Sequence, residues 1–452
     1  MVRLKRLGRC AMLALAAIAV HFAPFAVPAW AQSPSAAQSV TIRNSDELVI
    51  VVRRLIAAGQ HDAARQIIKA WRPGDATYRY RVRYVEGLIQ KAHGDYSAAI
   101  ATFRGILAER PGFTAVRLDL TETLFLAEDD DAAKHQAELL IAAGLDEQIG
   151  GGLRSIVGAI DDRRPIRFRG FASVLPSTNL NSGTDRRCIT IPGLPGCAII
   201  DDASRRKSGI GVLLGGEVLF RQQFTRDVAL IGSLGATGRF YPSIERGDLA
   251  LSGSAGFEKR WARGQAAVSL VAEHDYVDMR AAFTGLGVRV EGSRYVGRTS
   301  RVYGSVTVGL RDYASGSRQD GWRVAFSGFY DYMMEPARFV RVLGGLTVER
   351  TNSPVFSYTE WSAGLGYHTE LPMGLTVYTQ GLYAQRDYDA PYVAFGVRHD
   401  TRIEAQALVT KRDWNIAGFA PQLSYSFVDN QSNVPFYDYT SHALDLRLVK
   451  QF

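Results

Sequence analysis

The chain has 452 residues, a formal net charge of +8 and three cysteines, a length that allows two or three domains with ample core. Four of its basic residues lie in an N-terminal segment that we expect to be removed, which leaves 49 basic against 45 acidic residues. The remaining balance of +4 does not indicate a nucleic-acid-binding protein.

The N-terminus has the organisation of a secretory signal peptide. The basic stretch MVRLKRLGR precedes an apolar run rich in Ala and Leu, and Ala29 and Ala31 supply the small residues of a cleavage site. We therefore predict that residues 1–31 form a signal peptide and that residues 32–45 form a polar linker. A membrane anchor is the alternative, which the prolines of the apolar run disfavour.

Residues 46–165 show helical periodicity and a weak internal repeat. The segments AAGQHDAARQIIKAW, KAHGDYSAAIATFRGIL and LAEDDDAAKHQAELLI align on Ala64, Ala99 and Ala133, which are 35 and 34 residues apart. This is the period of tetratricopeptide repeats, so we predict three of them, with a generic helical bundle as the alternative. In the middle copy the expected packing residues are Gly87, Gly94, Ala99, Phe103 and Pro111.

From residue 166 to residue 452 the period changes to strict alternation. In residues 301–313, for example, valine, glycine and leucine at even positions alternate with mostly polar residues at odd positions. Successive side chains of a strand point to opposite faces, so one face suits lipid and the other a wet interior. Alternation over segments of ten or more residues is typical of an outer-membrane β-barrel.

The turns set the number of strands. Short connections recur near residues 224, 262, 298, 335, 372 and 412, and longer polar links such as EHDYVDMRAA and QRDYDAPYVAFGVRHD lie between them. Six short turns join twelve strands, and an opening and a closing strand make fourteen. We predict a periplasmic α-helical tetratricopeptide-repeat domain followed by a 14-stranded antiparallel transmembrane β-barrel in the outer membrane, with the short turns on the periplasmic side.

Two further features belong to the ends of this barrel. The longest link follows the first strand and holds Cys188 and Cys197, for which we predict a disulfide closing a surface loop, with a metal pair as the rival. The closing segment LDLRLVKQF places Leu446, Leu448 and Phe452 on one face and ends in an aromatic residue. A terminal aromatic on an alternating strand resembles the signal that the barrel-assembly machinery reads.

The interior of the barrel should carry charges of both signs. Alternation assigns to the lumen a set that includes Arg311, Arg341, Glu349, Glu404 and Arg447. Mixed signs argue against a strongly selective ion pore, because the charges can pair across the interior or line a wet path. Aromatic residues near strand ends fit interface girdles, namely Trp261, Trp322, Trp361, Tyr378 and Trp414.

The best candidate for a catalytic cluster is His274 with Asp275, beside Glu273. Adjacent residues of a strand point to opposite faces, so His274 and Asp275 cannot pair while the strand continues. We interpret them as polar residues at the loop end of the barrel. The sequence therefore predicts no catalytic residues, no cofactor and no metal site, and a protein that is not an enzyme.

This arrangement resembles the surface lipoprotein assembly modulator (Slam) family of Gram-negative bacteria. The resemblance is carried by GDYSAAIATFRGILAERPGF, RRPIRFRGFASVLPSTNLNSGT and LDLRLVKQF. It implies an outer-membrane translocon that delivers lipoproteins, or related secreted proteins such as haem-binding ones, from the periplasm to the cell surface. The partners that it implies are this client, a periplasmic chaperone, the barrel-assembly machinery and outer-membrane lipid, without nucleic acid.

The alternative function is a polysaccharide-export or diffusion porin with a periplasmic helical domain. Polysaccharide exporters carry many more repeats and need a strongly charged lining. Three repeats and mixed lumen charges favour protein transport, and a plain diffusion porin leaves the helical domain without a role.

Overall fold

The structure, a computed structural model, describes residues 45–71, 78–225, 227–297, 299–412, 414 and 419–450. The signal peptide predicted for residues 1–31, almost all of the predicted linker and Phe452 lie outside the described residues. The chain divides into two compact units, Met1–Leu48 and Val49–Phe452. The contacts between the helices and the barrel lie within the second unit.

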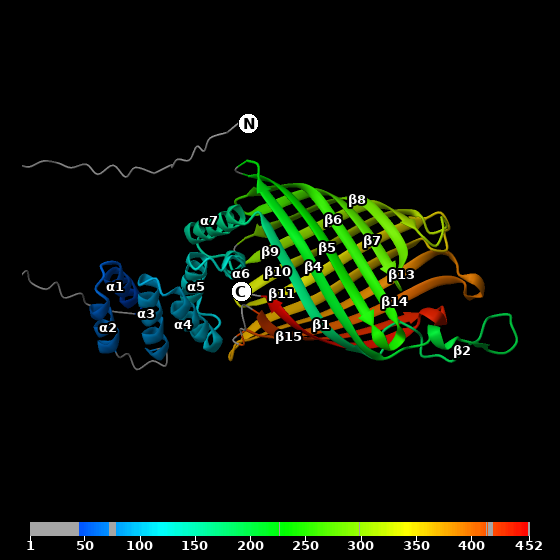
Figure 1. Cartoon of the computed structure of the whole chain (residues 1–452), viewed down its shortest axis with the longest axis horizontal. Coiled ribbons are helices and arrows are strands. Elements are labelled where there is room, and N and C mark those ends of the chain that lie inside the picture. Colours follow the sequence, from blue (N-terminus) through cyan, green and yellow to red (C-terminus); the bar gives the residue numbers. More distant parts are fainter. Residues whose placement is uncertain are drawn as a thin grey trace, which may run out of the picture. The chain divides into compact units, whose positions relative to one another are not determined.

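The helical region consists of three successive helix pairs and a longer last helix, counted over the described residues (Figure 1). The helices are α1 (Ser45–Ala57), α2 (His61–Ala70), α3 (Tyr78–Ala92), α4 (Tyr96–Glu109), α5 (Thr114–Leu126), α6 (Asp130–Ala142) and α7 (Glu147–Arg163). Among them, none combines the length and the continuous apolar character that a membrane span requires. The repeat positions Ala64, Ala99 and Ala133 lie on α2, α4 and α6 and are fully buried.

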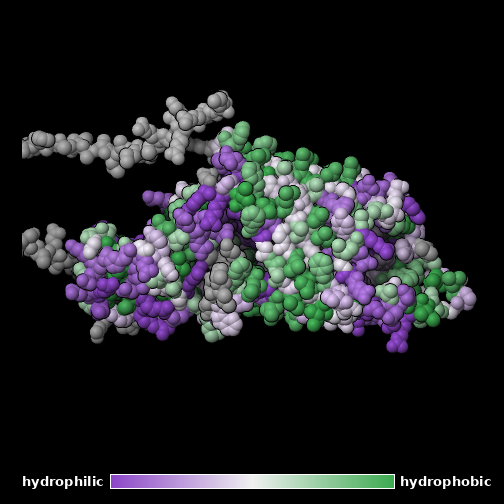
Figure 2. Space-filling view, viewed as in Figure 1, coloured by the Kyte–Doolittle hydropathy of each residue, from purple (hydrophilic) through white to green (hydrophobic). Residues whose placement is uncertain are grey.

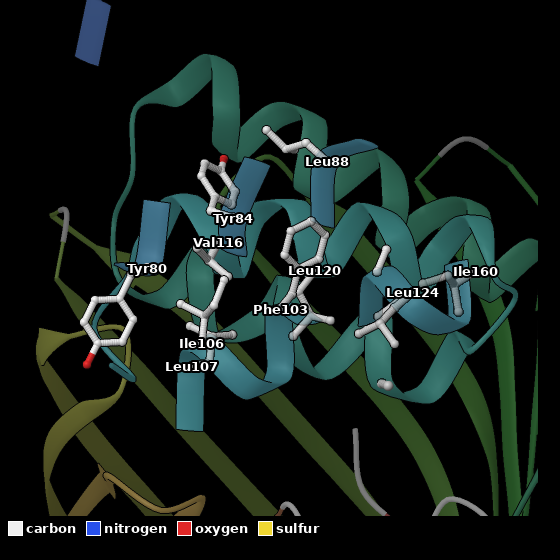
Figure 3. Close-up of a cluster of buried hydrophobic side chains, with 13 residues drawn as sticks. Tyr80, Tyr84, Leu88, Phe103, Ile106, Leu107, Val116, Leu120, Leu124 and Ile160 are labelled. Atoms are coloured by element: carbon white, nitrogen blue, oxygen red, sulfur yellow. The ribbon is translucent and has the colours of Figure 1, made fainter. Parts of the chain in front are cut away.

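A close approach between a glycine and an aromatic ring defines the middle pair. A Cβ atom placed on Gly87 of α3 would lie 2.5 Å from Cε1 of Phe103 on α4, so only a residue without a side chain fits there. Phe103 is fully buried and points into the same cluster as Leu120 and Leu124 (Figure 3). Gly94, in the turn between the two helices, has a φ of +80°, which glycine adopts without strain.

Fourteen antiparallel strands form a closed barrel, in agreement with the predicted number (Figure 1). They are β1 (Ile166–Ser177), β4 (Gly209–Gln223), β5 (Val228–Tyr241), β6 (Arg246–Trp261), β7 (Gly264–Val277), β8 (Arg280–Val296), β9 (Ser300–Tyr313), β10 (Gly321–Glu335), β11 (Arg338–Thr351), β12 (Tyr358–Leu371), β13 (Leu375–Pro391), β14 (Val397–Lys411), β15 (Phe419–Ser432) and β16 (Tyr439–Lys450). Two short strands, β2 (Cys188–Ile189) and β3 (Ala198–Ile199), form a separate hairpin in the link between β1 and β4.

The outer face of the barrel is apolar because the strands alternate as predicted. On β9, Val302, Val308 and Leu310 are exposed, whereas Tyr303 and Arg311 are partly buried. Figure 2 shows apolar residues gathered over the strands. This exposed apolar surface is the one that an outer-membrane barrel presents to lipid.

Two of the expected long links are shorter than the sequence suggested. Only Asp278 and Met279 separate β7 from β8, and both have positive φ, 53° and 55°, as a two-residue hairpin turn requires. Most of QRDYDAPYVAFGVRHD likewise belongs to β13 and β14. Polar residues end the alternation of hydropathy, but the strands continue beyond the apolar band, with a register shift after Asp275 in β7 and another after Asp387 in β13.

Candidate functional site: the barrel lumen and its rim

A cavity of about 550 Å³ lies inside the barrel against the strands β4 to β10. Its lining combines serine and glycine residues with charged ones such as Glu217, Glu273 and Arg289. Two hydroxyl pairs span neighbouring strands, Ser233 with Ser254 and Ser305 with Ser327, each with an oxygen–oxygen distance of 2.9 Å. The wall therefore presents serine hydroxyl groups, each of which can donate or accept a hydrogen bond.

A second cavity, of about 930 Å³, lies between α7 and the short-turn end of β4 to β10. Its lining includes Arg154, Asp161, Arg221 and Arg260. Tyr303 lines both this cavity and the one inside the barrel. The Tyr303 side chain thus borders both spaces, one beside the last helix and the other in the lumen.

The charges predicted for the lumen are neutralised by neighbours on the barrel wall. Arg311 Nη2 lies 2.8 Å from Glu273 Oε1, and Arg311 Nη1 lies 3.6 Å from Glu349 Oε2. The remaining ion pairs are Arg341 with Asp331, Glu404 with Arg402, and Arg447 with Asp445. Paired charges of both signs line the wall, as the mixed composition of the predicted set suggested.

A buried arginine joins α5 to the end of β12. Arg117 Nη2 lies 2.6 Å from Glu370 Oε2, and Arg117 Nη1 lies 3.3 Å from Glu370 Oε1. Arg117 also donates to Gln136 Oε1 at 2.7 Å and to the carbonyl oxygen of Pro111 at 2.8 Å. Arg412 Nη1 donates to Glu370 Oε2 at 2.6 Å. The predicted repeat residue Pro111 therefore helps to orient the side chain that joins the helices to the barrel.

An acidic residue near the end of α7 makes a second junction. Asp161 Oδ1 lies 2.6 Å from Lys134 Nζ on α6, and Asp161 Oδ2 pairs with Arg260 on β6. Burial by itself would raise the pKa of the Asp161 carboxyl, but Lys134 and Arg260 outweigh burial and hold this pKa below its ordinary value. The carboxylate is therefore charged at neutral pH, and α7 is tied to the short-turn rim.

The first helices of the three pairs share one polar cluster. Asp119 on α5 accepts a hydrogen bond from Tyr84 on α3 at 2.5 Å and from Arg53 on α1 at 2.6 Å. Lys91 Nζ lies 3.4 Å from Asp119 Oδ1. Burial raises the pKa of the Tyr84 hydroxyl and Asp119 raises it further, so the phenol remains a donor. This cluster holds α1, α3 and α5 together.

Several other predicted residues do not line these two cavities. Cys188 and Cys197 form a disulfide that closes the β2–β3 hairpin. Leu446 and Leu448 are exposed on the outer face of β16. His274 shares a hydrogen bond of 2.7 Å with Thr284 of β8. Within the described residues, no group of three or more His, Cys, Asp and Glu side chains could hold a metal ion.

One predicted girdle aromatic was placed on the wrong face. Tyr378 packs against Ala142 of α6, Met333 and Phe339, and its hydroxyl donates to Gln380 Oε1 at 2.7 Å. Tyr378 and the exposed Tyr383 are five positions apart on β13, so their side chains point to opposite faces of the strand. The residue therefore points inward, because alternation along the strand overrides its nearness to the strand end.

Sequence reasoning missed the residues that attach the helices to the barrel. Arg117 lies among apolar residues of α5, and an arginine at such a position is a sign that a buried partner exists. The partner could not be named from the sequence, because Glu370 is 253 residues away and belongs to another element type. The pairing of Asp161 with Arg260 could not be predicted for the same reason, because it joins a helix to a distant strand.

Comparison with known proteins identifies the family. Residues 167–452 match the family model described as surface lipoprotein assembly modifier, and residues 37–137 match the model of the N-terminal tetratricopeptide repeats of surface lipoprotein assembly modifiers. Both the resemblance noted from the sequence and the repeat assignment are therefore confirmed.

Two curated relatives illustrate the similarity. Surface lipoprotein assembly modifier 1 of Haemophilus influenzae is 20% identical over 426 residues, which cover 89% of this chain and 85% of the relative. Surface lipoprotein assembly modifier 1 of Neisseria meningitidis serogroup B is 23% identical over 398 residues, which cover 82% of this chain and 75% of the relative.

Similar solved structures include a bacterial polysaccharide outer membrane secretin, with 9% identity, a TM-score of 0.34, and coverage of 63% of this chain and 98% of that one. A Pseudomonas aeruginosa FadL homologue has 7% identity, a TM-score of 0.36, and coverage of 64% and 91% respectively. Because both TM-scores are low, the assignment rests on the family models and the relatives. With an outer-membrane barrel and a repeat domain that both match the same family, the chain belongs to the surface lipoprotein assembly modifiers.

Proposed function

We propose that this protein is an outer-membrane translocon that delivers lipoproteins, or related secreted proteins such as haem-binding ones, from the periplasm to the cell surface. Membership of the family supports a role in surface lipoprotein assembly. The observation that supports the proposed mechanism is the cavity beside α7, which shares the lining residue Tyr303 with the cavity in the lumen. A client held by the helices would meet the barrel at this point.

In this proposal the repeats capture the client. The polar cluster around Asp119 holds the first helices of all three pairs together, and the Gly87–Phe103 contact sets the spacing within the middle pair. Stacked repeats present an extended concave surface that suits an unfolded or chaperone-delivered segment. The ion pairs of Arg117 and Asp161 then keep that surface next to the barrel.

The turns of the barrel support a topology. Short turns of outer-membrane barrels face the periplasm, and α7 is tied to the short-turn rim through Asp161, so we place the helices in the periplasm. A signal peptide at residues 1–31 would direct the chain there. We further propose that the barrel-assembly machinery reads Leu446, Leu448 and Phe452 and that the apolar outer face contacts outer-membrane lipid.

Reconstitution in liposomes tests the proposal. A candidate client lipoprotein is enclosed with a periplasmic chaperone, and its accessibility to external protease is followed while an enclosed dye reports that the vesicles stay sealed. We expect the client to become accessible with the full chain, and to stay protected with a barrel that lacks residues 45–160. Passage of small sugars or ions without client movement would overturn the proposal in favour of a porin.

A further inference from the structure

The barrel closes where β1 meets β16, and this seam has far fewer paired residues than the others. All twelve residues of β1 pair with β4, and every other seam of the barrel has at least eleven paired positions within the described residues. Between β1 and β16 the paired positions are Ser173 with Arg447, Val174 with Leu446, and Ser177 with Ala443. Closure of the barrel therefore depends on a short stretch of the ladder.

The unpaired part lies at the short-turn end. Continuing the same register would place Ala172 opposite Leu448 and Gly170 opposite Lys450, yet within the described residues no ladder pair joins them. Leu448 to Lys450 pair with β15 only, and the β14–β15 ladder ends at Gln422. At this end the tips of β15 and β16 therefore form a two-stranded flap beside the free edge of β1.

The opposite end of the seam is fastened. The Thr178 amide donates to the His442 carbonyl oxygen at 2.9 Å, and the His442 amide donates to Thr178 Oγ1 at 2.9 Å. Asn179 Nδ2 adds a hydrogen bond of 3.1 Å to the Thr440 carbonyl oxygen. Any separation of β1 from β16 would thus begin at the short-turn end and stop at these hydrogen bonds.

Two prolines lie at or beside this seam. Pro176 lies in the interruption of the ladder between Val174 and Ser177, and proline has no backbone N–H to donate. Pro421 lies on β15 opposite Leu448, just past the last position paired with β14. A residue without a backbone N–H therefore lies on β1, at the seam, and another lies on β15, the strand that pairs with β16.

Within the described residues Gly170–Ala172 and Leu448–Lys450 share no ladder pair, and backbone N–H and C=O groups left without a partner in hydrocarbon cost several kcal/mol each. An exposed strand edge is also a template for another strand. The outer face of the unpaired stretch is apolar, because Phe168 and Leu448 are exposed there. Its inner face is polar, because Ser173 hydrogen-bonds to Asp445. An added strand would need alternating side chains to suit both sides.

We propose that the short-turn half of the β1–β16 seam binds an extended segment of the transported polypeptide, which adds as a strand between Gly170–Ala172 and Leu448–Lys450. Backbone hydrogen bonds recognise the segment, so the site takes alternating apolar and polar residues in place of one fixed sequence. The biological role of this binding rests on the proposed translocation, but the binding itself can be measured without a client.

The test uses a fluorescent peptide of about ten residues, the length of a membrane strand, with alternating valine and threonine. The full-length protein carries the photo-crosslinker p-benzoylphenylalanine at Leu448, and a matched protein carries it at Leu270, which is also exposed on the outer face. We expect the peptide to crosslink at position 448 and not at position 270. A peptide with a central proline, which cannot complete the ladder, should crosslink about tenfold less, a difference of about 1.4 kcal/mol.

A disulfide lock provides the second arm. In a background of Cys188→Ser and Cys197→Ser, the pair Ala172→Cys and Leu448→Cys should close the seam when oxidised. The control, Leu270→Cys with Val288→Cys, links residues that already pair between β7 and β8. Opposed residues of an antiparallel pair have the Cα separation that a disulfide needs. We expect the first lock to abolish peptide binding until reductant is added, and the control to leave it unchanged.

The outcomes distinguish the strand-addition site from the proposed translocon. Equal crosslinking at positions 448 and 270, or undiminished binding to the locked seam, would overturn the strand-addition site whether or not the protein delivers a client. Failure of the unmodified chain to deliver a client would overturn the translocon while leaving peptide binding intact. When both hold, oxidising the seam should also slow client delivery about tenfold or more. Undiminished delivery through a locked seam would exclude this route.

Discussion

Arg117 on α5 and Glu370 at the end of β12 form a two-point ion pair between residues 253 positions apart in the chain. Their side chains are only 1% and 3% exposed. Arg117 is oriented by Pro111 and Gln136, and Glu370 also accepts from Arg412. A buried charge with these partners is costly to leave unpaired, so this contact controls how firmly α5 stays on the barrel.

Glu370→Gln should loosen this attachment. Removing one charge of a buried pair costs about 3–5 kcal/mol, because the arginine loses its counter-charge. Hydrogen exchange in the full-length protein should show faster exchange in α5 and α6 while the barrel strands stay protected. The matched control is Glu109→Gln, which breaks the exposed pair with Arg83 and should cost less than about 1 kcal/mol. Equal exchange in the two variants would contradict the role assigned to Glu370.

Acidification should release α7 from the rim. The folded state holds the pKa of Asp161 below its ordinary value of 3.8, so its stabilising contribution is present above that value and is lost as the pH falls through the lower folded pKa. Protease cleavage between α7 and β1 should therefore rise at about pH 3 relative to pH 5. Asp161→Asn should be cleaved readily at both values and lose this pH dependence. A variant that keeps the unmodified profile would contradict the assignment.

Gly87→Ala should destabilise the middle repeat. The new methyl group would meet the fully buried ring of Phe103 at 2.5 Å, and overpacking of this kind costs about 1–3 kcal/mol. Thermal loss of helical circular dichroism in the full chain measures the effect. The control is Gly152→Ala on α7, where the added Cβ meets open space and should gain up to about 1 kcal/mol of helix propensity. Combining Gly87→Ala with Phe103→Leu should recover part of the loss.

Cysteine labelling tests the topology. Cys188→Ser leaves Cys197 free on the β2–β3 hairpin, where a membrane-impermeant maleimide should label it on intact cells. In a background without Cys188 and Cys197, a cysteine introduced by Ala262→Cys in the short β6–β7 turn should be labelled only after lysis. The opposite pattern would invert the proposed orientation of the barrel.

Phe452→Ala should reduce barrel insertion, since the terminal aromatic belongs to the predicted assembly signal. The amount of heat-modifiable protein in the outer membrane measures insertion. Phe257→Ala on β6 is the control, because it removes an exposed outward-facing aromatic of the same type away from the closing strand. Equal insertion of both variants would contradict a specific role for Phe452.

The local sequence determined the architecture of this protein. Alternation and turn spacing predicted the number of barrel strands. Successive side chains of a strand point to opposite faces, so the pattern can be recognised in each strand without knowing its partners. The helical repeat was visible for a similar reason, since Gly87 and Phe103 lie 16 residues apart within one repeat. Strand ends were less accurate around Asp278, where backbone pairing outlasts the alternation of hydropathy.

Only the tertiary structure decided how these parts are joined. The partners of Arg117 and Asp161 lie in the barrel, and no periodicity relates a helix to a strand end that is far away in sequence. The incomplete β1–β16 seam also depends on the tertiary structure, because β1 meets β16 only when the whole sheet closes into a barrel. Periodic patterns record which face of an element is buried, whereas contacts between distant elements depend on the path of the entire chain.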